Sequence, residues 1–271
     1  MDRSSHRARV LRYGAEESTR ADDQLAAEEP LEIRIGQKPL TVMMRTPGHE
    51  RELALGFLFG EGIIRSAGDV AGVAVVPNGE HPDIENVLEI DLTSNAPGVD
   101  RRWQRNFLAA SSCGLCGVST IEAIHQAAPP LPDDGLLIDP EVIYGLDARL
   151  RSEQAIFART GGLHAAGLFT LEGEPVAVRE DIGRHNAVDK VIGHAVERQL
   201  LPLDRHILMV SGRTSFEIVQ KALQARIPVL VAVSAPSSLA RDLAQASNQT
   251  LIGFLRGRSL NVYSGRQRIR P

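Results

Sequence analysis

Cysteine is nearly absent from this sequence. The 271 residues contain two cysteines, Cys113 and Cys116, and both fall in the stretch SSCGLCGVSTIE at residues 111–122. A disulfide framework would need several cysteines spread along the chain, so such a framework is excluded. The low cysteine content fits a reducing compartment, and we expect a cytoplasmic protein.

Long apolar runs and an excess of positive charge are also absent. No run reaches the ~18 apolar residues of a membrane-spanning helix, and the first residues, MDRSSHRARVLRYG, lack the apolar core of a secretory signal. The formal net charge of −4 argues against a generally basic nucleic-acid binder. With 43% hydrophobic and 24% charged residues, the composition is typical of a soluble globular protein. We therefore expect neither a membrane nor a nucleic acid among its partners.

The first part of the chain is expected to form a small subdomain. Residues 1–28 are polar, charged and poor in aromatics, which predicts a disordered tail. Residues 29–105 predict a small α+β unit. Its expected elements are a hairpin of residues 31–35 and 40–44, a helix within 47–64, and β-rich runs at 70–76 and 87–92.

Residues 106–271 alternate between strand and helix patterns after an initial helix and hairpin. The expected helices are 141–160, 180–199, 216–226 and 239–247, and the expected strands are 164–171, 175–178, 206–210, 229–233, 251–255 and 260–263. Such alternation predicts an α/β domain with parallel strands and right-handed crossovers. Lys190 and Lys221 fall on two of these helices and are interpreted as exposed.

The cysteine pair lies just before a predicted helix. Ser119 and Glu122 are spaced as a capping box, which predicts a helix that begins at about Thr120. Unpaired N–H groups and the helix dipole favour an anion at this end, next to Cys116, so at least one of the two cysteines is expected to be more reactive than a free thiol.

A C-x-x-C pair has four common uses. A structural zinc site needs two further ligands, and the sequence has no second C-x-x-C and no H-x3-5-H, so zinc would require distant histidines. A buried inert pair is disfavoured because serine and glycine give little apolar cover. A dithiol redox pair and a sulfur-carrying thiol remain, and local chemistry alone does not separate them.

Three loops rich in glycine, serine and arginine follow predicted strands, at residues 211–215, 234–238 and 256–259. Ligands of open α/β sheets bind beyond the carboxyl ends of the strands, and these residue types bind phosphate groups. They favour a phosphorylated ligand, although short connecting loops can have the same composition. His164 and His185 are further candidates for orienting a ligand, the alternative for His185 being a capped helix start with solvated charges.

The sequence resembles the FdhD family, the sulfurtransferases required for active formate dehydrogenase. Six stretches carry the resemblance: ELALGFLFGEGII at 52–64, SSCGLCG at 111–117, FARTGGLHAAGLF at 157–169, REDIGRHNAVDKVIG at 179–193, VSGRTSFEIVQKA at 210–222 and FLRGRSLNVYSGRQRI at 254–269. It implies a cytidine-deaminase-like α/β fold with an added N-terminal portion. A zinc deaminase also needs an H-x-E motif, but Ala166 stands in the position of that glutamate. We therefore expect neither deaminase activity nor a catalytic zinc.

The resemblance also implies a function. A cysteine desulfurase would pass a persulfide sulfur to Cys113, assisted by Cys116, and the sulfur would move to the molybdenum of the bis(molybdopterin guanine dinucleotide) cofactor before that cofactor enters apo-formate dehydrogenase. A homodimer is implied as well. The alternatives are a dithiol-disulfide oxidoreductase and a non-catalytic molybdenum cofactor chaperone. The cofactor-binding residues implied by the resemblance are Phe254, Leu255, Arg256, Gly257, Arg258 and Ser259.

Overall fold

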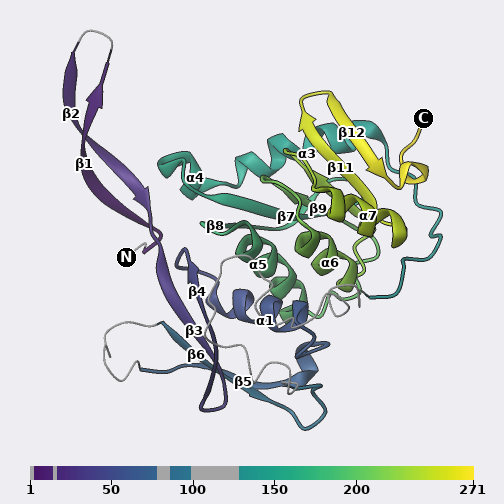
Figure 1. Ribbon diagram of the computed structural model, residues 1–271, viewed down its shortest axis with the longest axis horizontal. Helices are drawn as coiled ribbons and strands as arrows, with labels where there is room; N and C mark the ends of the chain where they lie inside the picture. Colours follow the sequence, from purple (N-terminus) through teal and green to yellow (C-terminus); the bar gives the residue numbers. More distant parts are fainter. Residues whose placement is uncertain (1–2, 15–16, 78–85, 99–127) are drawn as a thin grey trace.

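The computed structural model of the protein describes residues 3–14, 17–77, 86–98 and 128–271 (Figure 1). Its largest sheet has six strands in the order β12-β11-β10-β9-β7-β8. The three central strands β9, β10 and β11 are parallel, while β7, β8 and β12 run antiparallel to their neighbours. The strands are β7 His164–Thr170, β8 Pro175–Asp181, β9 His206–Val210, β10 Val229–Ala232, β11 Thr250–Arg256 and β12 Ser259–Ser264.

Helices cover both faces of this sheet. Apolar residues of α5, α6 and α7 pack on one face in a common core with Leu208, Val210 and Leu230. Helix α3 packs on the other face against Ile207 and Met209, as expected where successive side chains alternate across a strand. The helices are α3 Pro140–Ser152, α4 Ala155–Thr160, α5 Arg184–Glu197, α6 Phe216–Gln224 and α7 Ser238–Ala246.

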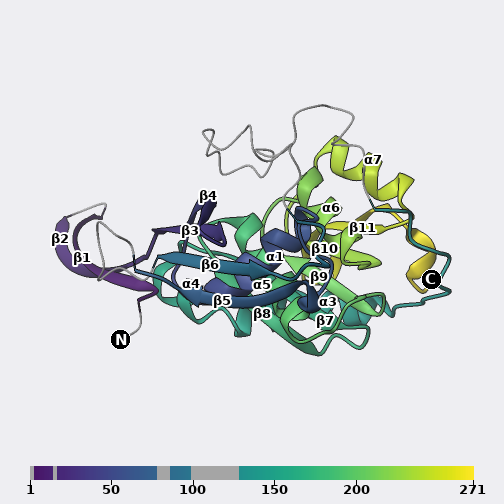
Figure 2. The same cartoon turned by 90° about the horizontal axis from the view of Figure 1, so that it is seen from below.

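A second sheet of four strands, in the order β4-β3-β6-β5, lies on the outer side of helix α1. Figure 2 shows β5 and β6 in front of α1 and α5. Leu31, Ile33 and Ile90 of this sheet belong to the same core as α1 and α5. The elements are β3 Glu29–Ile35, β4 Lys38–Arg45, α1 Glu50–Gly60, the 3-10 turn η1 Ala67–Asp69, β5 Val70–Val75 and β6 Val87–Leu92.

Two glycines bring α1 and α5 into backbone contact. A Cβ atom on Gly56 would collide with the carbonyl group of Asp189, and one on Gly193 would collide with that of Glu52. The pairing of 56 with 189 and of 52 with 193 makes the two helices antiparallel. The last turn of α1 therefore lies beside the first turn of α5.

The first residues form a hairpin that projects from the body of the protein (Figure 1). Strands β1 Ser5–Tyr13 and β2 Ser18–Ala26 pair along their whole length, and α4 contacts β2. The sequence predicts a disordered tail here, and that prediction is wrong for these strands. Most of their side chains are exposed, so the apolar alternation that identifies a half-buried strand is missing.

The mixed α/β fold class is confirmed, and one predicted helix differs from its prediction. The expected helix 141–160 is two helices, α3 and α4, because the N–H groups of Ile156 and Phe157 donate to the carboxylate of Glu180 at 2.9 and 2.7 Å. This contact with β8 caps a new helix. The domain boundary at residue 105 falls outside the described residues and stays a prediction.

Candidate functional site

The loops that follow β9 and β10 lie against each other at the carboxyl edge of the six-stranded sheet. The Thr214 N–H donates to the Ala235 carbonyl oxygen at 3.2 Å, and the Ser237 N–H donates to the Thr214 carbonyl oxygen at 3.0 Å. The expectation that residues 211–215 and 234–238 share one edge is confirmed.

The third candidate loop is the turn between β11 and β12. The Arg258 Nη1 donates to Glu141 Oε2 on α3 at 2.7 Å, and its guanidinium lies 5.3 Å from the centre of the Tyr144 ring. Leu255 is fully buried in the core under α3. The Phe254 N–H donates to a carbonyl oxygen of the second loop at 3.3 Å, so the segment adjoins the edge. Its role in cofactor binding stays a prediction.

Cationic and polar groups gather where the first loop meets the start of α5. A Cβ atom on Gly212 would lie 3.3 Å from His164 Nδ1 and 3.8 Å from Arg184 Cβ. Burial, with further contributions from Arg184 and Arg213, lowers the pKa of His164. Within the described ranges neither arginine forms an ion pair. Two buried polar groups in this region, the Arg184 Nε and the Thr214 hydroxyl, have no hydrogen-bond partner among the described residues. Thr214 is 1% exposed.

The helix ends add to this positive potential. Neither α5 nor α6 has a side-chain cap at its N-terminus, so both present backbone N–H groups at this edge. We call Arg184, Arg213 and these two helix ends the cationic edge; the His164 ring, whose lowered pKa favours its neutral form, lies beside them. An oxyanion such as a phosphate group fits it. Among the described residues no group of three His, Cys, Asp or Glu side chains could hold a metal ion.

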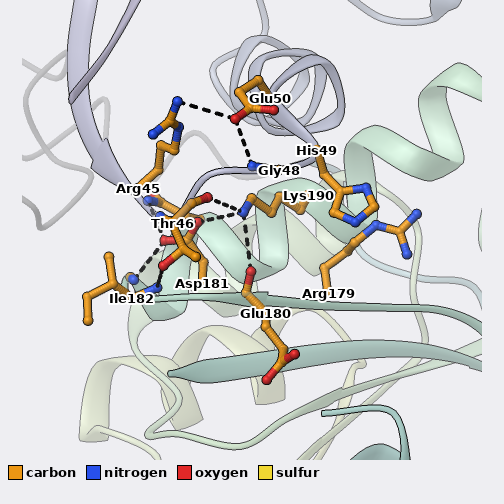
Figure 3. Close-up of polar contacts among 12 residues, drawn as sticks. Arg45, Thr46, Gly48, His49, Glu50, Arg179, Glu180, Asp181, Ile182 and Lys190 are labelled. Atoms are coloured by element: carbon orange, nitrogen blue, oxygen red, sulfur yellow. Dashed lines mark hydrogen bonds and ion pairs between the residues drawn. The ribbon is translucent and has the colours of Figure 1, made fainter. Parts of the chain in front are cut away.

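A buried network fixes the turn from which Arg184 extends (Figure 3). One oxygen of Asp181 accepts Lys190 Nζ at 2.8 Å and the Thr46 N–H at 3.2 Å, while the other accepts the Gly183 N–H at 2.9 Å. The Ile182 N–H donates to the Thr46 hydroxyl at 3.1 Å. The loop between β4 and α1 thus holds the start of α5 in place.

Lys190 is a structural residue of this network. Besides Asp181, its Nζ donates to the carbonyl oxygens of Thr46 at 3.0 Å and Glu180 at 3.2 Å, and Lys190 is 1% exposed. The prediction that it is exposed is wrong. Helix α5 lies between the large sheet and α1, so it is covered on two sides, whereas the prediction assumed one buried face.

A second polar cluster adjoins the cationic edge, where the first turns of α5 and α6 meet. His185 Nε2 lies 2.9 Å from Ser215 Oγ and 3.1 Å from Glu217 Oε2, and Ser215 Oγ donates to Glu217 Oε2 at 2.8 Å. Burial opposes ionisation of Glu217, but the hydrogen bonds from His185 and Ser215 lower its pKa. Against expectation, His185 is therefore buried and bonded rather than solvated.

Below this cluster lies a buried ion pair. Lys221 Nζ donates to Asp189 Oδ1 at 2.6 Å, and the two residues are 5% and 3% exposed. Burial raises the pKa of Asp189, with Lys221 opposing it. Burial lowers the pKa of Lys221, but Asp189 and Glu61 together raise it above its usual value. The prediction that Lys221 is exposed is wrong.

A compositional signal for these lysines was missed. Of the 30 lysine and arginine residues only three are lysine, namely Lys38, Lys190 and Lys221. Surface cations in this chain are almost all arginine, so a lysine within an apolar helix pattern is exceptional. Nothing in the local sequence of Glu61 shows that α6 packs beside it.

The cysteine pair lies outside the described residues, as does the helix expected at about Thr120. The described chain before it ends near α1, where the Gly98 N–H donates to the Ile63 carbonyl oxygen at 3.2 Å. After it, the Pro129 carbonyl oxygen accepts Arg226 Nη1 at 2.5 Å. The assignment of Cys113 and Cys116 as site residues therefore stays a prediction.

Comparisons with known proteins agree over nearly the whole chain. The sequence model of the FdhD/NarQ family matches residues 26–270. Proteins named Sulfur carrier protein FdhD are 50% identical in Streptomyces avermitilis, over 99% of this chain and 97% of that one, and 48% identical in Mycobacterium tuberculosis, over 98% of each.

A solved structure has the same fold. It belongs to a protein of Desulfotalea psychrophila, provisionally assigned as a formate dehydrogenase accessory protein. The TM-score is 0.80, with 98% of this chain and 100% of that chain covered, at 22% sequence identity. This likeness shows the fold. No helix in the described part of the chain is long and apolar enough to cross a membrane.

Proposed function

The chain belongs to the FdhD/NarQ family, and we propose that it is a sulfur carrier that serves a formate dehydrogenase. The observation that carries this proposal is the match to proteins named as sulfur carriers over 98–99% of the chain. The chain's own thiols agree with it, because its two cysteines are three positions apart in one segment.

Sulfur would be received at Cys113 by thiol–persulfide exchange. The Cys113 thiolate attacks the outer sulfur of a persulfide on a cysteine desulfurase. The new S–S bond forms at Cys113 as the donor's S–S bond breaks, and the desulfurase cysteine leaves as a thiolate. No net oxidation occurs in this step. Cys116 would assist by exchange with the neighbouring sulfur.

The acceptor would be the molybdenum of the bis(molybdopterin guanine dinucleotide) cofactor, bound as a substrate before its insertion into apo-formate dehydrogenase. The cationic edge supports this proposal, since pyrophosphate groups suit unpaired arginines and uncapped helix N-termini. The turn at residues 256–259 would contribute through Arg256, which is exposed. Arg258 is already paired with Glu141.

Intact mass after incubation with a cysteine desulfurase and free cysteine tests the sulfur step. We expect the mass of one added sulfur on the wild type and on Cys116→Ala, and none on Cys113→Ala. An internal disulfide without an adduct would instead favour the dithiol oxidoreductase. Unchanged thiols would leave a non-catalytic cofactor chaperone.

Nucleotide binding tests the acceptor site. We expect the double variant Arg184→Ala, Arg213→Ala to bind GDP at least tenfold more weakly than the wild type, because each arginine contributes a charge-assisted hydrogen bond. Replacing Arg256 and Arg258 together should also weaken binding. Unchanged affinity in either variant would remove that segment from the site. The predicted homodimer is tested by light scattering.

A further inference from the structure

Glu61 lies beside the cationic edge although it is distant from it in sequence. It directly follows α1, whose antiparallel contact with α5 brings this end toward Arg184 and His185. Helix α6 packs on the same side, since a Cβ atom on Gly60 would lie 2.8 Å from Lys221 Nζ. The carboxyl edge therefore has an acidic side next to its cationic one.

Three carboxylates act on Lys221 here, and they differ in what they already bind. Asp189 is buried and paired with Lys221. Glu217 accepts hydrogen bonds from Ser215 and is bonded to His185. Glu61 is partly exposed, and within the described part of the chain burial and nearby charges act on its carboxylate but no hydrogen bond does. It is thus the carboxylate with both oxygens left to accept from a ligand.

A ligand that binds both the cationic side and the acidic side of the edge needs a phosphate at one end and adjacent N–H donors at the other. Guanine presents N1–H and the N2 amino group side by side, and one carboxylate can accept from both. Adenine presents its amino group next to an acceptor nitrogen, which a carboxylate repels. An acidic group in this position would therefore separate the two purines.

We propose that Glu61 determines base specificity at this edge by accepting hydrogen bonds from N1–H and the N2 amino group of a guanine nucleotide whose phosphates lie on the cationic edge. This inference rests on the proposed function, since it concerns the guanine dinucleotide substrate. Lys221, Asp189 and Glu217 are the charged groups that act on Glu61, and Glu217 is bonded to His185, the residue after Arg184.

The charge state of Glu61 gives the site a pH dependence. Burial raises the pKa of Glu61 to about 7, with Lys221 opposing the rise and Asp189 and Glu217 adding to it. The protonated acid offers one acceptor fewer and one donor more than the carboxylate. Discrimination in favour of guanine should therefore increase as the pH rises from about 6 to about 8.

Titration calorimetry with GDP, IDP and ADP tests the proposal. IDP differs from GDP only in lacking the N2 amino group, so the ratio of the two affinities reports the contact made by that group. The ionisation of the phosphates affects both ligands equally and cancels in the ratio. We expect wild type to bind GDP about tenfold or more tightly than IDP, as for a lost hydrogen bond to a charged group. In Glu61→Gln and Glu61→Ala the affinities for GDP and IDP should differ by no more than about twofold, and their ratio should not change with pH.

Two further variants serve as controls. Glu153→Gln changes an exposed carboxylate after α3, on the opposite face of the sheet, and should keep the wild-type ratio. Arg184→Ala should weaken GDP and IDP equally. A wild-type ratio in Glu61→Gln would overturn this inference alone. Absence of GDP binding to the wild type would remove the cofactor proposal and this inference with it.

Discussion

Helix α5 carries one member of each of two buried lysine–aspartate pairs, and the pairs differ in how completely they are bonded. Lys190 Nζ donates to Asp181 and to two backbone carbonyl oxygens, which uses all three of its N–H groups. Lys221 Nζ donates to Asp189 and otherwise lies 5.9 Å from the centre of the Phe57 ring. Two further carboxylates, Glu61 and Glu217, contribute to its electrostatic surroundings.

This difference distinguishes a pair that holds a turn from a pair that lies beside the free carboxylate of the proposed site. In the Lys190–Asp181 pair all ammonium N–H groups are used, and the carboxylate also accepts backbone N–H groups. This pair holds a turn and has no donor or acceptor available for a ligand. The Lys221–Asp189 pair has two further carboxylates nearby, and one of them, Glu61, is left as a free hydrogen-bond acceptor at the surface. Titratable groups with perturbed pKa values are frequent at functional sites. Burial alone does not distinguish the two pairs, because both are nearly inaccessible.

The largest effect is expected for Lys190→Met. Removing the ammonium leaves Asp181 buried without its counter-ion and frees two buried carbonyl oxygens, which should lower the free energy of unfolding by about 3–5 kcal/mol. Urea denaturation measures this loss. Lys38→Met, at an exposed position of β4, is the matched control and should change stability by less than about 0.5 kcal/mol. A loss no larger than that of the control would contradict a structural role for the pair.

Gly193→Ala tests the contact that brings the second pair and Glu61 together. The added methyl group meets the Glu52 carbonyl group, so α1 must move away from α5. We expect a loss of about 1–3 kcal/mol. Gly145→Ala on α3 is the control, since a Cβ atom there would lie 3.9 Å from Arg149 Nε. That variant should be neutral or up to about 1 kcal/mol more stable. Equal effects in both would show that α1 and α5 are not in close contact.

Lys221→Met should destabilise less than Lys190→Met, by about 2 kcal/mol. Burial already raises the pKa of Asp189, so this carboxyl can take up a proton when the ammonium is lost. Urea denaturation of the two lysine variants side by side gives the comparison directly. A loss in Lys221→Met as large as that in Lys190→Met would mean that both pairs are structural.

The sequence predicted the order of strands and helices well because each has its own apolar pattern and turn residues. Strands β9, β10 and β11 and the loops that follow them were found this way. The burial of Lys190 and Lys221 was not predicted, because it depends on α1 and β4, which cover α5 from positions more than a hundred residues away in the sequence. The proximity of Glu61 to Glu217 has the same origin, since it follows from a helix crossing set by Gly56 and Gly193. The hairpin of β1 and β2 was missed because neither face is buried.

The last expected effect concerns the pH dependence of stability. The usual pKa of a glutamate, 4.5, is raised to about 7 for Glu61 in the folded state. Between these values the folded state binds more protons than the unfolded state, so the contribution of Glu61 to the free energy of unfolding is full below pH 4.5 and is lost as the pH rises to about 7. Urea denaturation of the wild type and Glu61→Gln across this range should show a smaller fall for the variant. Glu153→Gln should retain the wild-type fall, since its carboxylate is exposed. An unchanged pH dependence in Glu61→Gln would mean that Glu61 ionises as an ordinary surface glutamate, and the second pair would then lack the free carboxylate with a raised pKa that distinguishes it from the first.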